Sequence, residues 1–71
     1  GRASDAIADL EEALRGDPRH ARASYELAAV LAAAGDRKRA ESVLRTGLEN
    51  VPNSRLLKSA LNDLQATAKQ K

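Results

Sequence analysis

Apolar residues recur at spacings of three and four along four stretches of the chain, and short polar turns separate these stretches. Such spacing places the apolar side chains on one face of an α-helix. We therefore expect helices over residues of about 3–15, 18–34, 37–50 and 54–68. The apolar stripes expected to form the core are Ile7, Leu10 and Leu14; Ala23, Leu27, Val30, Leu31 and Ala34; Ala40, Leu44, Gly47, Leu48 and Val51; and Leu57, Leu61, Leu64 and Ala68.

Glycine, proline and aspartate mark the expected helix ends. Gly16 is expected to end the first helix in the left-handed conformation. Asp17 is expected to cap the second helix, with Pro18 at its first helical position. Gly35 should end the second helix and Asp36 should cap the third.

The connections between the expected helices are short, and loops of two to eight residues favour antiparallel neighbours in a helical bundle. The predicted fold class is therefore all-α, with four antiparallel helices in a single domain over residues 1–71.

A fixed interval links the two halves of the chain. Pro18 and Pro52 lie 34 residues apart. The same interval separates five further pairs of identical residues, namely Gly1 and Gly35, Ala6 and Ala40, Leu10 and Leu44, Leu14 and Leu48, and Leu27 and Leu61. A period of this length indicates a repeated helical hairpin.

The repeat resembles the tetratricopeptide repeat, whose pattern is Trp-x2-Leu-Gly-x2-Tyr, then Ala-x3-Phe, then Pro. Ser24, Leu31 and Leu44 stand where the family prefers Trp, Tyr and Phe. Asn62 and Gln65 depart from the pattern, so the last helix resembles a capping helix. The resemblance implies hairpins stacked in a short right-handed solenoid. The positions that fit the pattern are Leu27, Ala28, Ala40 and Pro52, with Ala6, Ala13, Pro18 and Leu61 in the flanking half-repeats.

Composition narrows the classes of function. Tyr25 is the only aromatic residue, so the core must be built from Leu, Val, Ile and Ala. The absence of cysteine excludes disulfides and thiolate metal sites and leaves the redox compartment open. We expect no membrane insertion, because no long apolar run occurs. The chain begins within a repeat, so we expect it to be a piece of a longer protein, and its localisation stays open.

Two features of the third helix are unusual. Gly47 in mid-helix costs about 1 kcal/mol relative to alanine, which indicates that a neighbouring group packs closely there. Arg37, Lys38 and Arg39 occupy the positive end of the helix dipole, which is mildly unfavourable. We interpret this basic run as a solvated surface held by Asp36 and Glu41.

The sequence does not indicate an enzyme. His20 is the only histidine, and one imidazole without cysteine does not build a standard zinc site. No glycine-rich phosphate loop or nucleophile motif occurs, so we expect no catalytic residue, metal or cofactor. Asp5, Asp9 and Glu12 share a helix face and are interpreted as solubilising surface.

A second stripe on the second helix lies about half a turn from its core stripe, with spacings of three and four. It contains the only aromatic side chain, and aromatic and arginine residues are enriched in binding hot spots. The resemblance implies that this side lines a concave groove that binds a peptide or a partner helix. The expected groove residues are Arg22, Tyr25, Ala29 and Ala32 on the second helix, with Leu56, Ser59, Asp63 and Ala66 on the fourth.

The predicted function is therefore a protein–protein interaction module. One alternative is self-association, in which an apolar flank around Ile7 on the first helix forms a weak homodimer. A third hypothesis is nucleic-acid binding, which the scattered basic residues and the near absence of stacking aromatics disfavour. The basic residues concerned are Arg19, Arg22, Arg37, Lys38, Arg39 and Arg45.

Overall fold

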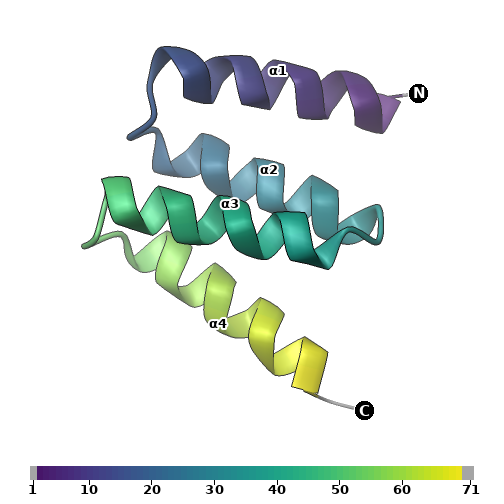
Figure 1. The fold of residues 1–71 in the computed structure, drawn as a ribbon, viewed down its shortest axis with the longest axis vertical. Coiled ribbons are helices and arrows are strands. Elements are labelled where there is room, and N and C mark those ends of the chain that lie inside the picture. Colours follow the sequence, from purple (N-terminus) through teal and green to yellow (C-terminus); the bar gives the residue numbers. More distant parts are fainter. Residues whose placement is uncertain (1, 70–71) are drawn as a thin grey trace.

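The computed structural model describes residues 2–69, with side chains from residue 4 to residue 66. Four helices fill the described range, joined by short turns (Figure 1). No strand occurs among these residues, which confirms the all-α class. The helices are α1 (Arg2–Gly16), α2 (Ala21–Ala33), α3 (Arg37–Asn50) and α4 (Arg55–Lys69).

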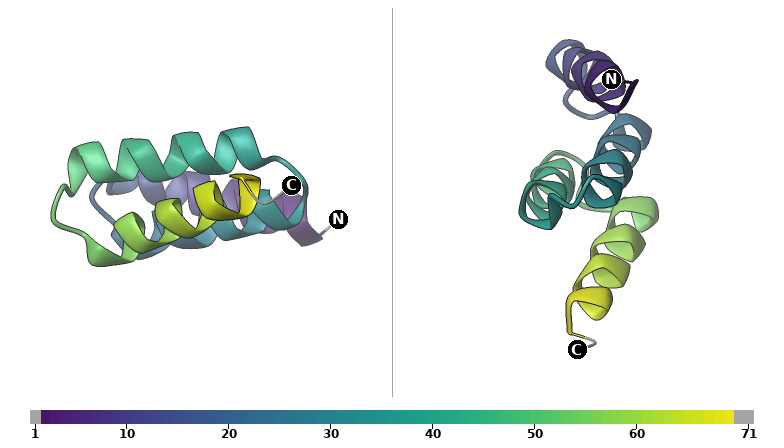
Figure 2. Two further views of the ribbon diagram at one scale, coloured as in Figure 1. Left: turned by 90° about the horizontal axis from the view of Figure 1, so that it is seen from below. Right: turned by 90° about the vertical axis from the view of Figure 1, so that its right-hand side faces the viewer.

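The helices follow one another in antiparallel order, so α1 and α3 run in one direction and α2 and α4 in the other (Figure 1). Seen end-on, α3 lies to one side of α2, while α1 lies above α2 and α4 below it (Figure 2, right). Among the described residues, α2 packs against all three other helices, whereas α1 packs only against α2. The second helix is therefore the centre of the arrangement.

The core consists of small and branched aliphatic side chains between α2, α3 and α4. Most of the expected stripe residues are buried or half-buried, but Ala34 is exposed because it follows the last residue of α2 and caps it. The expected core residue Ala68 has a side chain outside the described residues. The fully buried cluster is Leu27, Ala28, Leu31, Ala40, Leu44 and Leu57.

The second helix begins three residues later than expected, so the prediction that Asp17 caps it is wrong. Asp17 instead closes a turn, in which its Oδ1 accepts a hydrogen bond from the Arg19 amide over 3.2 Å. Its carbonyl accepts the His20 amide over 3.0 Å. His20 is the actual N-cap, and its Nδ1 accepts the Ala23 amide over 3.1 Å. Pro18 lies in the turn and not at the first helical position.

Gly35 ends α2 as expected. Its φ is 92°, and it is the only residue with positive φ in the described range. The Asp36 amide donates to the Leu31 carbonyl over 2.8 Å and the Gly35 amide to the Ala32 carbonyl over 3.0 Å, which is the Schellman pattern. Gly16 is the last residue of α1, so the helix ends where expected, but the predicted left-handed conformation is wrong because Gly35 alone has positive φ among the described residues.

The starts of α3 and α4 are capped by side chains. Asp36 Oδ1 accepts the Arg39 amide over 3.3 Å, as expected. Ser54 Oγ accepts the Leu57 amide over 3.2 Å, which fixes the start of α4. Each cap satisfies one of the backbone donors that a helix start leaves unpaired.

Gly47 lies where α3 meets both α2 and α4. A Cβ atom at this position would lie 2.8 Å from Leu57 Cδ1 and 3.1 Å from Ser24 Oγ. The close approach expected from the sequence is therefore present. Ser24 is itself 2% exposed, so the small side chains at the two positions let α2 and α3 come together.

Candidate functional site

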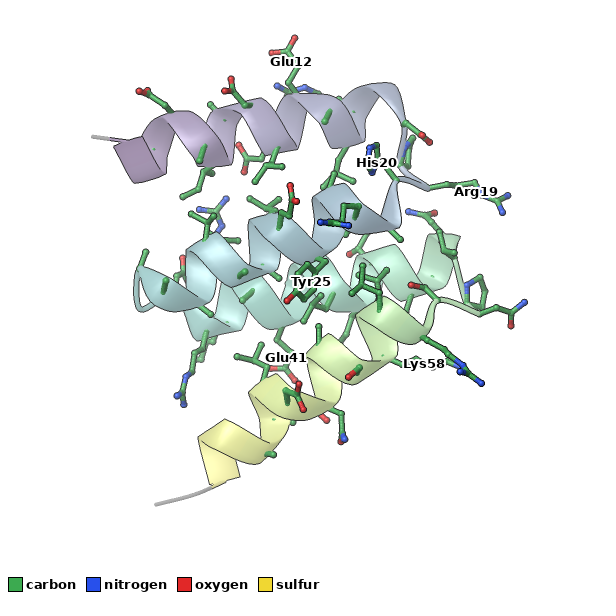
Figure 3. The ribbon with its side chains drawn as sticks, turned by 180° about the vertical axis from the view of Figure 1, so that it is seen from behind. Glu12, Arg19, His20, Tyr25, Glu41 and Lys58 are labelled. Atoms are coloured by element: carbon green, nitrogen blue, oxygen red, sulfur yellow. The ribbon has the colours of Figure 1, made fainter. Side chains whose placement is uncertain are left out.

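A shallow hollow of about 250 Å³ lies between α2 and α4, with α3 at its base. Figure 3 shows Tyr25 in the middle of this side of the molecule, between the two helices. The hollow is mostly apolar, and Asp63 is its one acidic side chain. Its lining residues are Tyr25, Ala28, Ala29, Ala32, Leu44, Ala60, Asp63 and Leu64. We call this hollow the α2–α4 groove.

Four of the expected groove residues line this surface: Tyr25, Ala29 and Ala32 from α2, and Asp63 from α4. Their spacing explains the grouping, because residues three and four apart in a helix lie on the same face.

The other expected groove residues do not line it. Arg22 is turned to Glu26 one helical turn away, and its Nε donates to Glu26 Oε2 over 3.2 Å. Leu56 and Ser59 lie earlier on α4 and are exposed, and Ala66 is exposed beyond the groove. Leu56 shares the face of Asp63, because seven residues make two helical turns.

Four further residues line the groove and were not predicted for it. Leu44 and Leu64 were expected in the core stripes, whereas Ala28 and Ala60 were expected in neither the stripes nor the groove. Ala60 and Leu64 are only half-buried, so their side chains serve the core and the groove together. Ala60 and Leu64 each follow a core leucine by three residues, Leu57 and Leu61 respectively, which was a visible signal, but spacing alone does not show how far two helices separate.

The large exposed apolar side chains lie around this groove. Within the described range, Tyr25 is 38% exposed and Leu56 is 39% exposed, and no other large apolar residue is as exposed. By contrast, Ile7 on α1 is half-buried and packs against the core. Ile7 therefore exposes less of its side chain than Tyr25 or Leu56 does.

Acidic partners neutralise several of the basic side chains, so the basic residues do not form one continuous positive surface. Arg39 Nη2 lies 2.8 Å from Glu11 Oε2, and Arg45 Nη2 lies 2.6 Å from Glu41 Oε2. The expected role of Glu41 in holding the basic run is wrong. Glu41 instead accepts hydrogen bonds from Arg45, one turn along α3, and from Gln65 on α4. Figure 3 shows Glu41 beside α4.

The described residues show no feature of a metal site or a membrane span. No group of three His, Cys, Asp or Glu side chains gathers in this range. None of the four helices has both the length and the apolar character needed to cross a bilayer. His20 caps α2 through its ring nitrogen, which gives this residue a structural role.

The comparison with known families decides the assignment. A family model described as Tetratricopeptide repeat matches residues 1–64. The chain belongs to the tetratricopeptide repeat family. No curated protein and no solved structure matches it. Tetratricopeptide repeats are helical scaffolds that generally mediate protein–protein interactions and are generally not catalytic, and stacked repeats of this kind create extended binding surfaces.

Proposed function

We propose that this tetratricopeptide repeat chain binds a peptide or a partner helix in the α2–α4 groove. The observation that carries the proposal is the exposure of Tyr25 at an otherwise apolar hollow. A solvent-exposed aromatic ring beside small side chains loses hydration favourably when a partner covers it. Small alanines at Ala29 and Ala32 permit a backbone or helix to approach α2 closely.

The lining suggests the chemistry of the partner. Apolar contacts dominate the lining, which suits a segment with apolar residues. An acidic group in the partner has less support, because Arg22 points along its own helix to Glu26. The groove of about 250 Å³ is small, so we expect weak affinity.

The experiment is a selection of random peptides displayed on phage against the chain. Selected peptides are then measured against Ala29→Arg, which places a long charged side chain in the groove. Ala13→Arg is the matched control, because Ala13 is also an exposed alanine within a helix but lies on α1. We expect Ala29→Arg to weaken binding at least tenfold and Ala13→Arg to leave it within a factor of two.

Equal binding of the selected peptides to both variants would contradict the proposal. Tyr25→Ala gives a second measure, because removing the ring deletes the largest exposed apolar contact without adding charge. Circular dichroism of each variant separates loss of binding from loss of folding.

A further inference from the structure

A larger cavity lies on another side of the molecule, between α1 and α3. Its volume is about 350 Å³. It shares no lining residue with the α2–α4 groove, and no part of the proposed function uses it. The lining residues are Leu14, Pro18, Ser24, Arg39, Ser42, Val43, Thr46, Gly47 and Asn50. We call it the α1–α3 cavity.

In the described range α1 and α3 both pack on α2 but not on each other, and two side-chain bonds from α3 reach α1 and the turn that follows it. At one end Arg39 of α3 binds Glu11 of α1 over 2.8 Å. At the other end Asn50 Nδ2 donates to the Pro18 carbonyl over 3.4 Å. Between these bridges the backbones of α1 and α3 stay apart.

The base of the cavity is formed by Ser24 and Gly47, which have small side chains or none. The tetratricopeptide pattern prefers tryptophan at the position of Ser24. Ser24 carries far less apolar area than a tryptophan, and together with Gly47 it closes the base of the cavity without filling it.

The lining combines apolar and polar side chains. Leu14 and Val43 supply apolar walls, while Ser42 and Thr46 are exposed hydroxyl residues on α3. Arg39 is the one ionisable side chain in the lining. An arginine has five N–H donors in a planar fork, and its pair with Glu11 uses a single donor, so further donors are available to an anion.

The charge near Arg39 favours an anion. Arg37 and Lys38 precede it in the first turn of α3, and the helix start adds a partial positive charge. Two carboxylates oppose them, Asp36 at the N-cap and Glu11 in the ion pair. Three cations, two carboxylates and the helix dipole leave this end of the cavity positive.

We propose that the α1–α3 cavity binds a small planar aromatic carboxylate. The α1–α3 cavity is open to solvent, and its volume of about 350 Å³ gives room for a two-ring group. The ring lies over Ser24 and Gly47 between Leu14 and Val43. The carboxylate meets Arg39 at the rim, where a charge-assisted hydrogen bond fixes its direction.

The test uses N-acetyltryptophan as the probe and N-acetyltryptophan amide as its uncharged partner. The chain has no tryptophan, so the indole fluorescence of the probe is read without interference. We expect saturable binding of the acid, at least tenfold weaker binding of the amide, and loss of affinity as salt rises. Amide shifts in an NMR titration should concentrate at Ser42, Val43 and Thr46.

Three variants test whether the probe binds in the α1–α3 cavity. Arg39→Gln should reduce the affinity for the acid to that for the amide. Lys38→Gln is the control, because it removes a neighbouring charge that does not line the cavity, and it should cost less than threefold. Thr46→Phe should fill the cavity and prevent binding without adding an indole, and circular dichroism verifies that it folds.

Three results would overturn the proposal. The first is no binding of the probe at roughly 10 mM, the weakest affinity of interest. The others are equal affinity for the acid and the amide, and no effect of Arg39→Gln on the affinity. Shifts centred on Tyr25 and Ala29 would place the probe in the α2–α4 groove and would also refute it. Tyr25→Ala separates the two surfaces, because it should weaken peptide binding and leave probe binding unchanged.

Discussion

At the scale of single residues, Gly47 is the position with the least space. The nearest atoms to an added Cβ are Leu57 Cδ1 at 2.8 Å, and Ser24 Oγ and Cβ at 3.1 and 3.2 Å. Leu57 is fully buried and Ser24 nearly so, which leaves both side chains little freedom to move. Gly47 therefore sets the distance between α3 and its two neighbours.

We predict that Gly47→Ala destabilises the protein although alanine favours a helix. The gain in helix propensity is about 1 kcal/mol, and overpacking of a tight contact costs roughly 1–3 kcal/mol. We expect Gly47→Leu to cost more. Urea denaturation measures both, and a Gly47→Ala variant that is more stable than the parent contradicts this prediction.

A double-mutant cycle identifies the contact responsible. Leu57→Val removes the Cδ1 atom that lies nearest to the added Cβ. In that background the penalty for Gly47→Ala should shrink, because the two changes share one contact. Additive effects would show that Ser24, and not Leu57, limits the space.

His20 gives a second prediction at this scale. Its Nδ1 accepts the Ala23 amide at the start of α2. Aspartate is a preferred N-cap residue, and its negative charge suits the positive end of the helix dipole. We expect His20→Asp to raise stability by about 0.5–1 kcal/mol and His20→Ala to lower it. Thermal unfolding at neutral pH compares the two, and the reverse order would show that His20 is not the effective cap.

At the scale of helices, the apolar spacing predicted four helices, and α3 has the expected bounds of 37–50. The start of α2 was predicted wrongly because Asp17 and Pro18 fit a helix start and a turn equally well. The hydrogen bonds from Arg19 and His20 to Asp17 decide for the turn. Those bonds depend on how the chain leaves α1, which local spacing does not determine.

The neighbouring leucines of α4 test the packing of the helices. Leu57 is fully buried, while Leu56 is 39% exposed. We predict that Leu57→Ala costs roughly 2–5 kcal/mol, as buried leucines do elsewhere. Leu44→Ala on α3 should cost the same, because Leu44 is 1% exposed. Leu56→Ala is the matched control and should cost under about 0.5 kcal/mol, as surface substitutions usually do.

A chain of this size has a total stability of roughly 4–10 kcal/mol. Leu57→Ala and Leu44→Ala should therefore be partly unfolded at 37 °C, and Leu56→Ala should not. Circular dichroism melting curves distinguish them. An unchanged melting curve for Leu44→Ala would show that Leu44 does not contribute to the core.

At the scale of the whole molecule, the family and the general position of the groove followed from the sequence, but its exact lining did not. Tyr25, Ala29 and Ala32 were predictable because they share one face of α2. Leu44 and Leu64 were not, because their contribution depends on the separation of α2 and α4. The α1–α3 cavity could not be predicted either, because it depends on how α1 and α3 each pack against α2.

The same arrangement predicts where the molecule opens first. In the described range α1 packs only against α2, and its apolar residues Ile7, Leu10 and Leu14 are half-buried. The stability of stacked repeats depends on contacts between neighbouring helices, so an end helix with one neighbour has the lowest local stability. Native-state hydrogen exchange should therefore show the slowest amides in α2 and α3 and faster exchange in α1.

The bridge between Glu11 and Arg39 adds a second tie to α1, but both side chains are substantially exposed, and such a pair contributes at most about 1 kcal/mol. Glu11→Gln should therefore speed exchange in α1 by no more than about fivefold and leave α2 unchanged. If the amides of α1 exchange as slowly as those of α2 in the parent, the four helices unfold as one cooperative unit and the order of opening proposed here is wrong.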